Sequence, residues 1–310
     1  MKRILITGGN GFIGKHLIKI LDSSDYEIVT LGKSSNGLNH LKIDLLNIQP
    51  EDKLTEGYDV IIHLASYISV GEAISNPKKT IENNVMSTLN LLEDMKNYNP
   101  NGLLIFASSE KIYGDPISDP VKESDVGMPL DPYGHSKLIS ELMIQSYHNT
   151  HNLNYVIFRS GNVFGPGQNS NLFLPSVMSR IAKGENTIVV GNLNHFRNFI
   201  YVEDLVNAFK ICIEHSNLKN NTFNLSVYHK TIQNMIDQIT LLSKQKLNRE
   251  ILFIQREEMK RKSCFESKPF NMDCSKAHNL LKWGPEYSFL EAIERTFEGY
   301  INHNELVKKN

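Results

Sequence analysis

The sequence has few cysteines, little net charge and no long apolar run. Its three cysteines, Cys212, Cys264 and Cys274, lack the close paired spacing of a zinc site or a disulfide framework. No apolar stretch approaches the roughly 20 residues that a membrane-spanning helix needs. A formal net charge of -1 gives no broad attraction to nucleic acid or anionic lipid. We therefore expect no metal site, no nucleic-acid partner and no membrane partner.

The N-terminus also lacks the apolar core of a secretion signal, because residues 1–7 run directly into Gly8 and Gly9. We therefore expect a cytoplasmic protein. With 310 residues, of which 40% are apolar, the chain can bury one large core or two closely joined ones. Any anionic ligand must be held by a few placed side chains, which favours a small molecule over a polymer.

Short apolar runs alternate with helical patterns in the first half of the chain. Apolar residues recur at helical spacing in residues 12–21 and 86–95. This alternation predicts strands joined by crossover helices, and hence an α/β fold with a parallel sheet. The runs that predict strands are residues 4–7, 28–31, 41–43, 60–64, 103–107 and 155–158.

A glycine-rich turn, residues 8–14, joins the first predicted strand to the first predicted helix. In this setting Gly8 permits the tight turn, and Gly11 lets a pyrophosphate approach the backbone. Gly14 lets the helix and strand pack closely, while the helix N-terminus offers amide donors and partial positive charge. The turn therefore predicts a dinucleotide site in a Rossmann-like, doubly wound sheet.

The pattern changes after residue 160, where Gly165-Pro166-Gly167 and short mixed segments replace the regular alternation. We assign residues 1–160 to a dinucleotide-binding domain and residues 161–310 mainly to a smaller α/β substrate-binding portion. The chain is expected to return to the first domain near residues 190–215.

Tyr133 and Lys137 form a second motif. They follow Asp131-Pro132, a typical helix start, and their spacing of four places them on one helix face. The pKa of tyrosine is ordinarily about 10, and a fixed ammonium nearby favours the phenolate. We therefore expect Lys137 to lower the pKa of Tyr133 towards neutral pH, so that Tyr133 can exchange a proton with a substrate hydroxyl.

These motifs resemble the extended short-chain dehydrogenase/reductase superfamily, in particular its NAD-dependent epimerase/dehydratase family acting on sugar nucleotides. The G-x-x-G-x-x-G spacing, the Tyr133 and Lys137 pair and the segment 106–114, which ends in Tyr-Gly, carry the resemblance. It implies an enzyme with Ser109, Tyr133 and Lys137 as catalytic residues. Ser109 would orient the reacting oxygen, and Lys137 would also hold the nicotinamide ribose. Ser108 is expected to satisfy local backbone groups, and His63 to be structural.

The resemblance extends over nearly the whole chain and implies a binding set. Arg197 would hold the nucleotide diphosphate through its forked donors, with Ser109, Asn162 and Asn171 as further substrate contacts. Arg256 and Arg261 are alternative candidates for a second phosphate-binding arginine. The expected cofactor-binding residues are Gly8, Asn10, Gly11, Phe12, Ile13, Gly14, Lys33, Ser34, Asp44, Leu45, Leu64, Ala65, Tyr133 and Lys137.

The family resemblance also implies a homodimer. Its helices would be those over residues 86–95 and 138–147, packed as a two-fold four-helix interface. The apolar stripes of these helices fit equally well against the sheet.

The choice of cofactor depends on the end of the second predicted strand. An NAD enzyme often places Asp or Glu there, whereas this chain has Gly32-Lys33-Ser34-Ser35. A carboxylate would repel the 2′-phosphate of NADP, while a lysine and hydroxyls attract it. We therefore expect NADP to be preferred, with NAD as the other possibility.

Two reactions fit the sequence best. A 4,6-dehydratase needs an acid and a base just after Ser109, but here Glu110 is followed by Lys111. We favour a reductase that uses NADPH on a nucleotide-diphosphate 4-keto-6-deoxy sugar at C4. The alternative is a 4-epimerase that uses tightly bound NAD. A non-catalytic cofactor-binding regulator is the third reading, and it has no need of the catalytic set.

Overall fold

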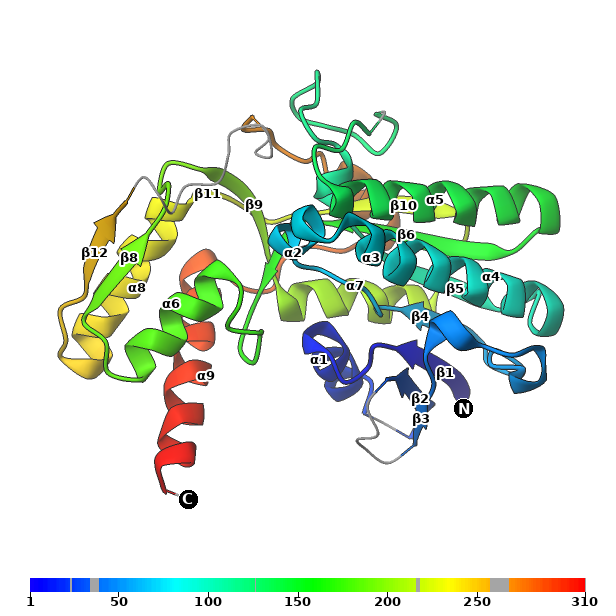
Figure 1. Cartoon of the computed structure of the whole chain (residues 1–310), viewed down its shortest axis with the longest axis horizontal. Coiled ribbons are helices and arrows are strands. Elements are labelled where there is room, and N and C mark those ends of the chain that lie inside the picture. The colour runs from blue at the N-terminus through cyan, green and yellow to red at the C-terminus, as the bar shows by residue number, and fades with distance from the viewer. Residues whose placement is uncertain (23, 34–38, 126, 216–217, 257–267, 310) are drawn as a thin grey trace.

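The structure is a computed structural model that describes residues 1–309, except 23, 34–38, 126, 216–217 and 257–267. A seven-stranded sheet has the order β10-β6-β5-β4-β1-β2-β3, and its neighbouring strands are parallel (Figure 1). The strands are β1 (Lys2–Thr7), β2 (Tyr26–Gly32), β3 (His40–Lys42), β4 (Val60–His63), β5 (Leu103–Ser109), β6 (Asn154–Ser160) and β10 (Asn221–Leu225).

Both faces of this sheet are covered, as runs of consecutive buried residues in its strands indicate. Ile4, Leu5 and Ile6 are completely buried, and successive strand residues point to opposite faces. One face packs against α1 (Phe12–Ile20) and α7 (Val202–Glu214), and the other against α4 (Ser87–Tyr98) and α5 (Pro132–His151). Every predicted strand run overlaps an observed strand. The α/β, Rossmann-like prediction is confirmed.

The second half of the chain forms a smaller layer beside the carboxyl ends of the main strands (Figure 1). The chain packs against the main sheet again through α7 and joins it through β10. The smaller layer contains a three-stranded sheet and a two-stranded sheet. Its elements are β7 (Asn162–Phe164), α6 (Phe173–Ala182), β8 (Thr187–Val190), β9 (Phe196–Tyr201), β11 (Tyr228–Thr231), α8 (Ile232–Leu247), β12 (Leu252–Gln255) and α9 (Phe289–Lys309).

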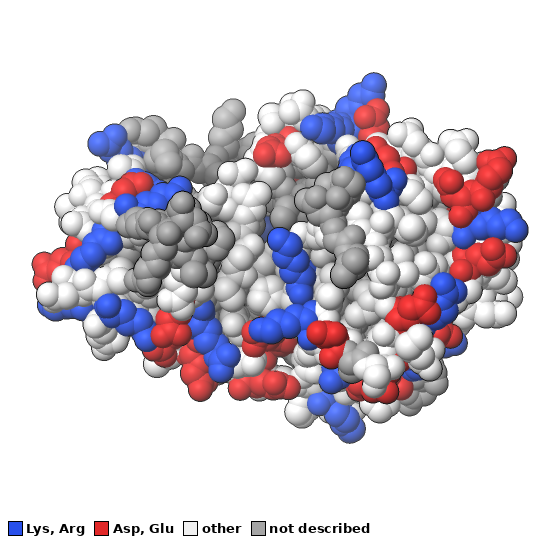
Figure 2. Space-filling view, turned by 90° about the horizontal axis from the view of Figure 1, so that it is seen from below, with Lys and Arg blue, Asp and Glu red and all other residues white. Residues whose placement is uncertain are grey.

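The surface matches the balanced composition. Figure 2 shows Lys and Arg interspersed with Asp and Glu over one face of the molecule. In the part of the chain that the structure describes, no helix is long and apolar enough to cross a membrane. The same residues contain no cluster of three or more His, Cys, Asp or Glu side chains able to hold a metal ion.

Candidate active site

The glycine turn between β1 and α1 has no room for a side chain at Gly8 or Gly14. Gly8 has a positive φ of 72°, and a Cβ there would lie 2.8 Å from the backbone nitrogen of Ala65. A Cβ on Gly14 would lie 2.5 Å from the carbonyl oxygen of Gly9, and one on Gly11 would lie 3.1 Å from that of Gly8. The bare backbone therefore leaves the N-terminus of α1 open to a pyrophosphate.

A cavity of about 470 Å³ opens beside this turn. Two buried polar atoms of this region, Nδ2 of Asn10 and Oγ of Ser66, have no hydrogen-bond partner within the described protein. A bound dinucleotide would offer them partners, so the residues present fit such a cofactor. Of the residues predicted to bind cofactor, the cavity lining includes Gly8, Gly11, Lys33, Asp44, Leu45, Leu64 and Ala65.

The other predicted cofactor residues do not line this cavity: Asn10 lies in the glycine turn, Gly14 in α1, and Tyr133 and Lys137 in α5. Phe12 and Ile13 belong to the first turn of α1 and pack against the main core. Ser34 lies outside the described residues. The cavity is formed by the segments at the ends of β1, β2, β3 and β4, together with Lys79, Asn83 and Ser87 from the helices that follow β4.

Lys33 is paired within this cavity. Its ammonium lies 3.1 Å from Oδ2 of Asp44 and donates to Oδ1 of Asn83. The preference for NADP is predicted from the end of the second strand alone, but Asp44, which follows β3, brings a carboxylate to the same place. Because Asp44 offsets the charge of Lys33, the expected attraction to a 2′-phosphate is weakened.

The structure brings Ser109, Tyr133 and Lys137 together at the carboxyl end of β5. Asp131 caps α5 by accepting a hydrogen bond from the Gly134 amide at 2.9 Å, which fixes the first turn of the helix. The ammonium of Lys137 donates to the carbonyl oxygen of Ala107 at 2.8 Å and lies 5.9 Å from the centre of the Tyr133 ring. The side chains of Tyr133 and Ser109 are hydrogen-bonded.

Burial governs the ionisation of this cluster. It raises the pKa of Tyr133 to about 12, although the hydrogen bond from Ser109 acts in the opposite direction. It lowers the pKa of Lys137 to about 7, against the attraction of Glu141. The prediction that Lys137 lowers the pKa of Tyr133 is therefore wrong, because burial favours the uncharged form of both side chains.

A buried ion pair holds α5 against β6. Arg159 of β6 donates to Oε2 of Glu141 in α5 at 2.8 Å and to the Tyr113 hydroxyl at 2.8 Å. The hydroxyl of Ser108 donates to the same glutamate. Ser108 therefore contacts a side chain, not the local backbone groups expected from the sequence, and it helps to hold α5 against β5 and β6.

His63 has both ring nitrogens satisfied. Its Nδ1 lies 2.7 Å from the Thr7 hydroxyl and its Nε2 lies 3.1 Å from the Thr88 hydroxyl. Burial and, to a lesser extent, the charge of Lys137 lower its pKa to about 3. These contacts are those of a neutral structural histidine, as the sequence suggested.

The predicted substrate residues other than Ser109 are spread over the smaller layer. Asn162 starts β7, and its Nδ2 donates to Oε1 of Glu110 at 2.6 Å, immediately beside the Ser109 position. Arg197 lies in β9 directly opposite Lys230 of β11, and its guanidinium donates to the carbonyl oxygen of Phe196 at 3.0 Å.

The remaining candidates lie on the loops of the smaller layer. Asn171 is exposed on the segment before α6, and its backbone N–H donates to Oδ1 of Asn169. Arg256 follows β12 and donates through its backbone to Val190. Arg261 lies outside the described residues.

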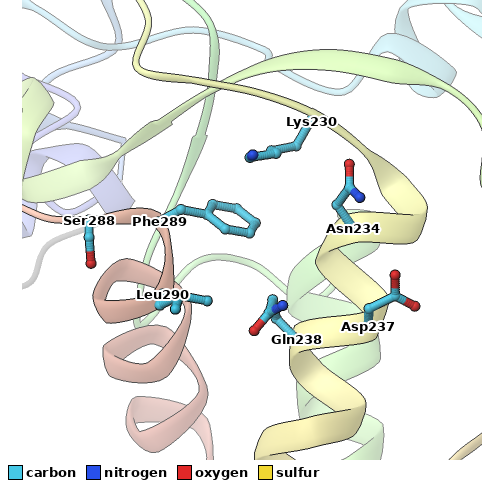
Figure 3. Close-up of a pocket in the computed structure, with 7 residues that line it drawn as sticks. All are labelled: Lys230, Asn234, Asp237, Gln238, Ser288, Phe289 and Leu290. Atoms are coloured by element: carbon cyan, nitrogen blue, oxygen red, sulfur yellow. The ribbon is translucent and has the colours of Figure 1, made fainter.

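A second cavity, of about 450 Å³, lies between α8 and α9 (Figure 3). Among its lining residues, Lys230 lies over the ring of Phe289, 5.4 Å from its centre. None of the described residues that the sequence assigned to the site lines this cavity.

Sequence reasoning missed one buried group. Glu110 follows Ser109 and is only 4% exposed, and each of its carboxylate oxygens accepts an amide hydrogen bond from the smaller layer. In the local sequence, Glu110 is notable only because Lys111 follows it where a dehydratase needs a second acid–base residue. Its partners come from strands that are distant in sequence.

The sheet order, the glycine turn and the adjoining cavity define a dinucleotide-binding α/β protein. The NAD dependent epimerase/dehydratase family matches residues 4–226, and the chain belongs to this family. It is therefore an NAD(P)-dependent enzyme that uses a nicotinamide cofactor. The family resemblance drawn from the motifs is confirmed.

Similar proteins include several 4-epimerases. The chain is 27% identical over 331 residues to the UDP-glucose 4-epimerase of Halalkalibacterium halodurans, covering 97% of this chain and 96% of the relative. A UDP-N-acetylglucosamine 4-epimerase from Methanobrevibacter ruminantium M1, in complex with UDP-N-acetylmuramic acid, is 28% identical with a TM-score of 0.85, covering 97% and 99%. A UDP-glucuronic acid 4-epimerase from Bacillus cereus, in complex with UDP-glucuronic acid and NAD, is 25% identical with a TM-score of 0.84, covering 97% and 99%.

Proposed function

We propose that this protein is a nucleotide-sugar 4-epimerase that uses bound NAD. The observation that carries the choice is the ion pair between Lys33 and Asp44, since Lys33 was the main reason to favour NADP and a reductase. A carboxylate this close to Lys33 opposes the binding of a 2′-phosphate there. The 4-epimerases among the similar proteins support the same choice.

The catalytic roles follow from the cluster at the end of β5. Bound NAD would supply the acceptor for the hydride that leaves C4 of the sugar and the donor that returns it. As the hydride leaves C4, Tyr133 in its phenolate form would accept the proton of the C4 hydroxyl, and as the hydride returns the phenol would give that proton back. Against the effect of burial, the hydrogen bond with Ser109 lowers the pKa of Tyr133 and aligns its oxygen with the reacting one. Lys137, held by the Ala107 carbonyl, lies beside Tyr133 and would donate a hydrogen bond to the cofactor ribose.

Dehydration remains disfavoured for a structural reason. Both oxygens of Glu110 are engaged by Asn162 and Asn198, and Lys111 occupies the next position. Elimination of water needs an acid and a base free to act on neighbouring sugar carbons. This arrangement supplies neither a second carboxylate nor an unengaged first one.

The 4-keto reductase is the second candidate, because the side chain of Lys33 is 61% exposed and can turn towards an added phosphate. One experiment separates the two functions. The purified protein is denatured to identify any released nucleotide, and the native protein is given UDP-glucose, UDP-N-acetylglucosamine or UDP-glucuronic acid. An epimerase interconverts the C4 configurations without net cofactor loss. Consumption of NADPH with a 4-keto-6-deoxy sugar nucleotide, without C4 interconversion, contradicts the proposal.

We also propose a homodimer formed through the helices around residues 86–95 and 138–147. Leu91, Leu92 and Met95 face the sheet, but Ile139 and Leu142 of α5 remain 38% and 57% exposed. These exposed apolar side chains suit a two-fold helical interface. Sedimentation equilibrium should give twice the 35.3 kDa chain mass, and a single-chain mass at all concentrations contradicts the dimer.

A further inference from the structure

We propose that Glu110 is a positioning residue that sets the three-stranded sheet β7, β9 and β11 against the turn that carries Ser109. This inference rests on the proposed function, because it concerns how the bound sugar is aligned for the same reaction. Glu110 begins a short 3-10 turn immediately after Ser109, and its side chain is almost completely buried.

The two carboxylate oxygens of Glu110 bind two different strands. Oε1 accepts from Nδ2 of Asn162 in β7 at 2.6 Å, and Oε2 accepts from Nδ2 of Asn198 in β9 at 2.7 Å. The ammonium of Lys111 lies 3.7 Å from Oε1 and adds a positive charge. One side chain thus ties the end of β5 to two strands of the smaller layer.

The third strand is joined through Asn198. Because the Nδ2 of Asn198 donates to Glu110 and to the carbonyl oxygen of Phe270, its Oδ1 is left to accept from Nδ1 of His229 in β11, at 2.6 Å. This assignment makes the Nδ1 of His229 the protonated nitrogen. Every strand of the small sheet is therefore linked, directly or through one amide, to the residue beside Ser109.

The backbone around these bonds leaves little room for adjustment. Ser109 pairs with Ser160 at the ends of β5 and β6, and the chain passes from there through Gly161 to Asn162. A Cβ on Gly161 would lie 2.8 Å from the carbonyl oxygen of Asn198. The strand junction and β9 are thus already in close contact, and the carboxylate fixes their register relative to the catalytic turn.

This geometry makes a specific demand on residue 110. Both of its terminal atoms must accept hydrogen bonds, and a carboxylate meets the demand while a carboxamide offers one acceptor and one donor group. Glu110→Gln therefore places one NH₂ group against the amide of Asn162 or Asn198. Glu123→Gln is the matched control, since Glu123 is half-buried and accepts only one bond of this kind, from the Asn224 backbone at 2.8 Å. A glutamine oxygen can still accept that bond.

The test combines hydrogen exchange with kinetics on the full chain loaded with NAD. Glu110→Gln should speed amide exchange in β9 and β11 and lower kcat on the order of 10- to 100-fold, as a misaligned substrate does. The affinity for NAD should stay within about twofold of wild type, because the cofactor cavity is formed by other residues. Glu123→Gln should leave exchange in these strands and kcat at wild-type values.

A second variant keeps the test decisive if the Glu110→Gln protein does not fold. His229→Phe keeps an aromatic ring beside Phe196 and removes only the outermost bond of the network. It should give a smaller change in the same direction. Unchanged exchange or unchanged kcat in a folded Glu110→Gln protein overturns the proposal, as does an equal loss in Glu123→Gln. If Glu110→Gln is unfolded, an unchanged His229→Phe protein overturns it.

The exchange measurement also separates this inference from the proposed function. If the wild-type protein acts on no sugar nucleotide, the proposed function fails, and the exchange of β9 and β11 alone decides whether Glu110 holds the sheet. If the wild-type protein is an active epimerase and exchange is unaffected by Glu110→Gln, the function stands and the positioning role fails.

Discussion

Alanine substitutions at three glycines test the cofactor turn. In Gly14→Ala the new Cβ lies 2.5 Å from the Gly9 carbonyl oxygen and 2.6 Å from Gly9 Cα, and these backbone atoms cannot rotate away. We expect the free energy of unfolding to fall by about 1–3 kcal/mol through overpacking. In Gly11→Ala the nearest atom is the Gly8 oxygen at 3.1 Å, so the loss of stability should be below about 1 kcal/mol.

The two variants should differ in stability but agree in cofactor binding. The methyl of Gly11→Ala stands where the pyrophosphate must approach the backbone, so we expect NAD affinity to fall at least about tenfold, or about 1.4 kcal/mol. Gly14→Ala should weaken binding similarly by displacing the turn. Gly71→Ala is the control, because a Cβ there meets no atom within 4 Å. It should keep wild-type affinity.

Urea unfolding and titration calorimetry with NAD measure these effects. Wild-type affinity in Gly11→Ala would refute the idea that a pyrophosphate approaches this backbone. Equal stability of Gly14→Ala and Gly71→Ala would refute the packing argument itself, since the first creates three contacts of 2.7 Å or less and the second creates none within 4 Å.

Two further predictions concern single side chains. Tyr133→Phe should lower turnover by about 10²–10⁴ while NAD binding measured by calorimetry stays nearly unchanged; full turnover would remove Tyr133 from proton transfer. His63 has a pKa of about 3 in the folded state, whereas the unfolded chain takes up its proton near pH 6.5. Its contribution is therefore complete above about pH 6.5 and should decline by about 1.4 kcal/mol per pH unit as the pH falls towards 3. Urea unfolding at several pH values should show a shallower slope for His63→Asn, and an identical slope contradicts the argument.

The sequence by itself determined the features that depend on neighbours along the chain. The strands of the main sheet follow from short apolar runs, and α1 from apolar residues at helical spacing. The glycine turn predicts a dinucleotide site because a strand precedes it and a helix follows it. The spacing of four between Tyr133 and Lys137 placed both on the first turns of α5. These inferences succeeded because local periodicity sets which face each residue occupies.

Only the tertiary structure decided how the site is charged and held. Lys33 meets Asp44 because β2 and β3 end side by side, and this contact is why we propose NAD and epimerisation in place of NADP and reduction. Glu110 finds its amide partners 52 and 88 residues further along the chain. The neutral state of Tyr133 arises from burial. Charge pairing and desolvation depend on whichever groups the fold brings within a few ångströms, and local sequence does not specify those groups.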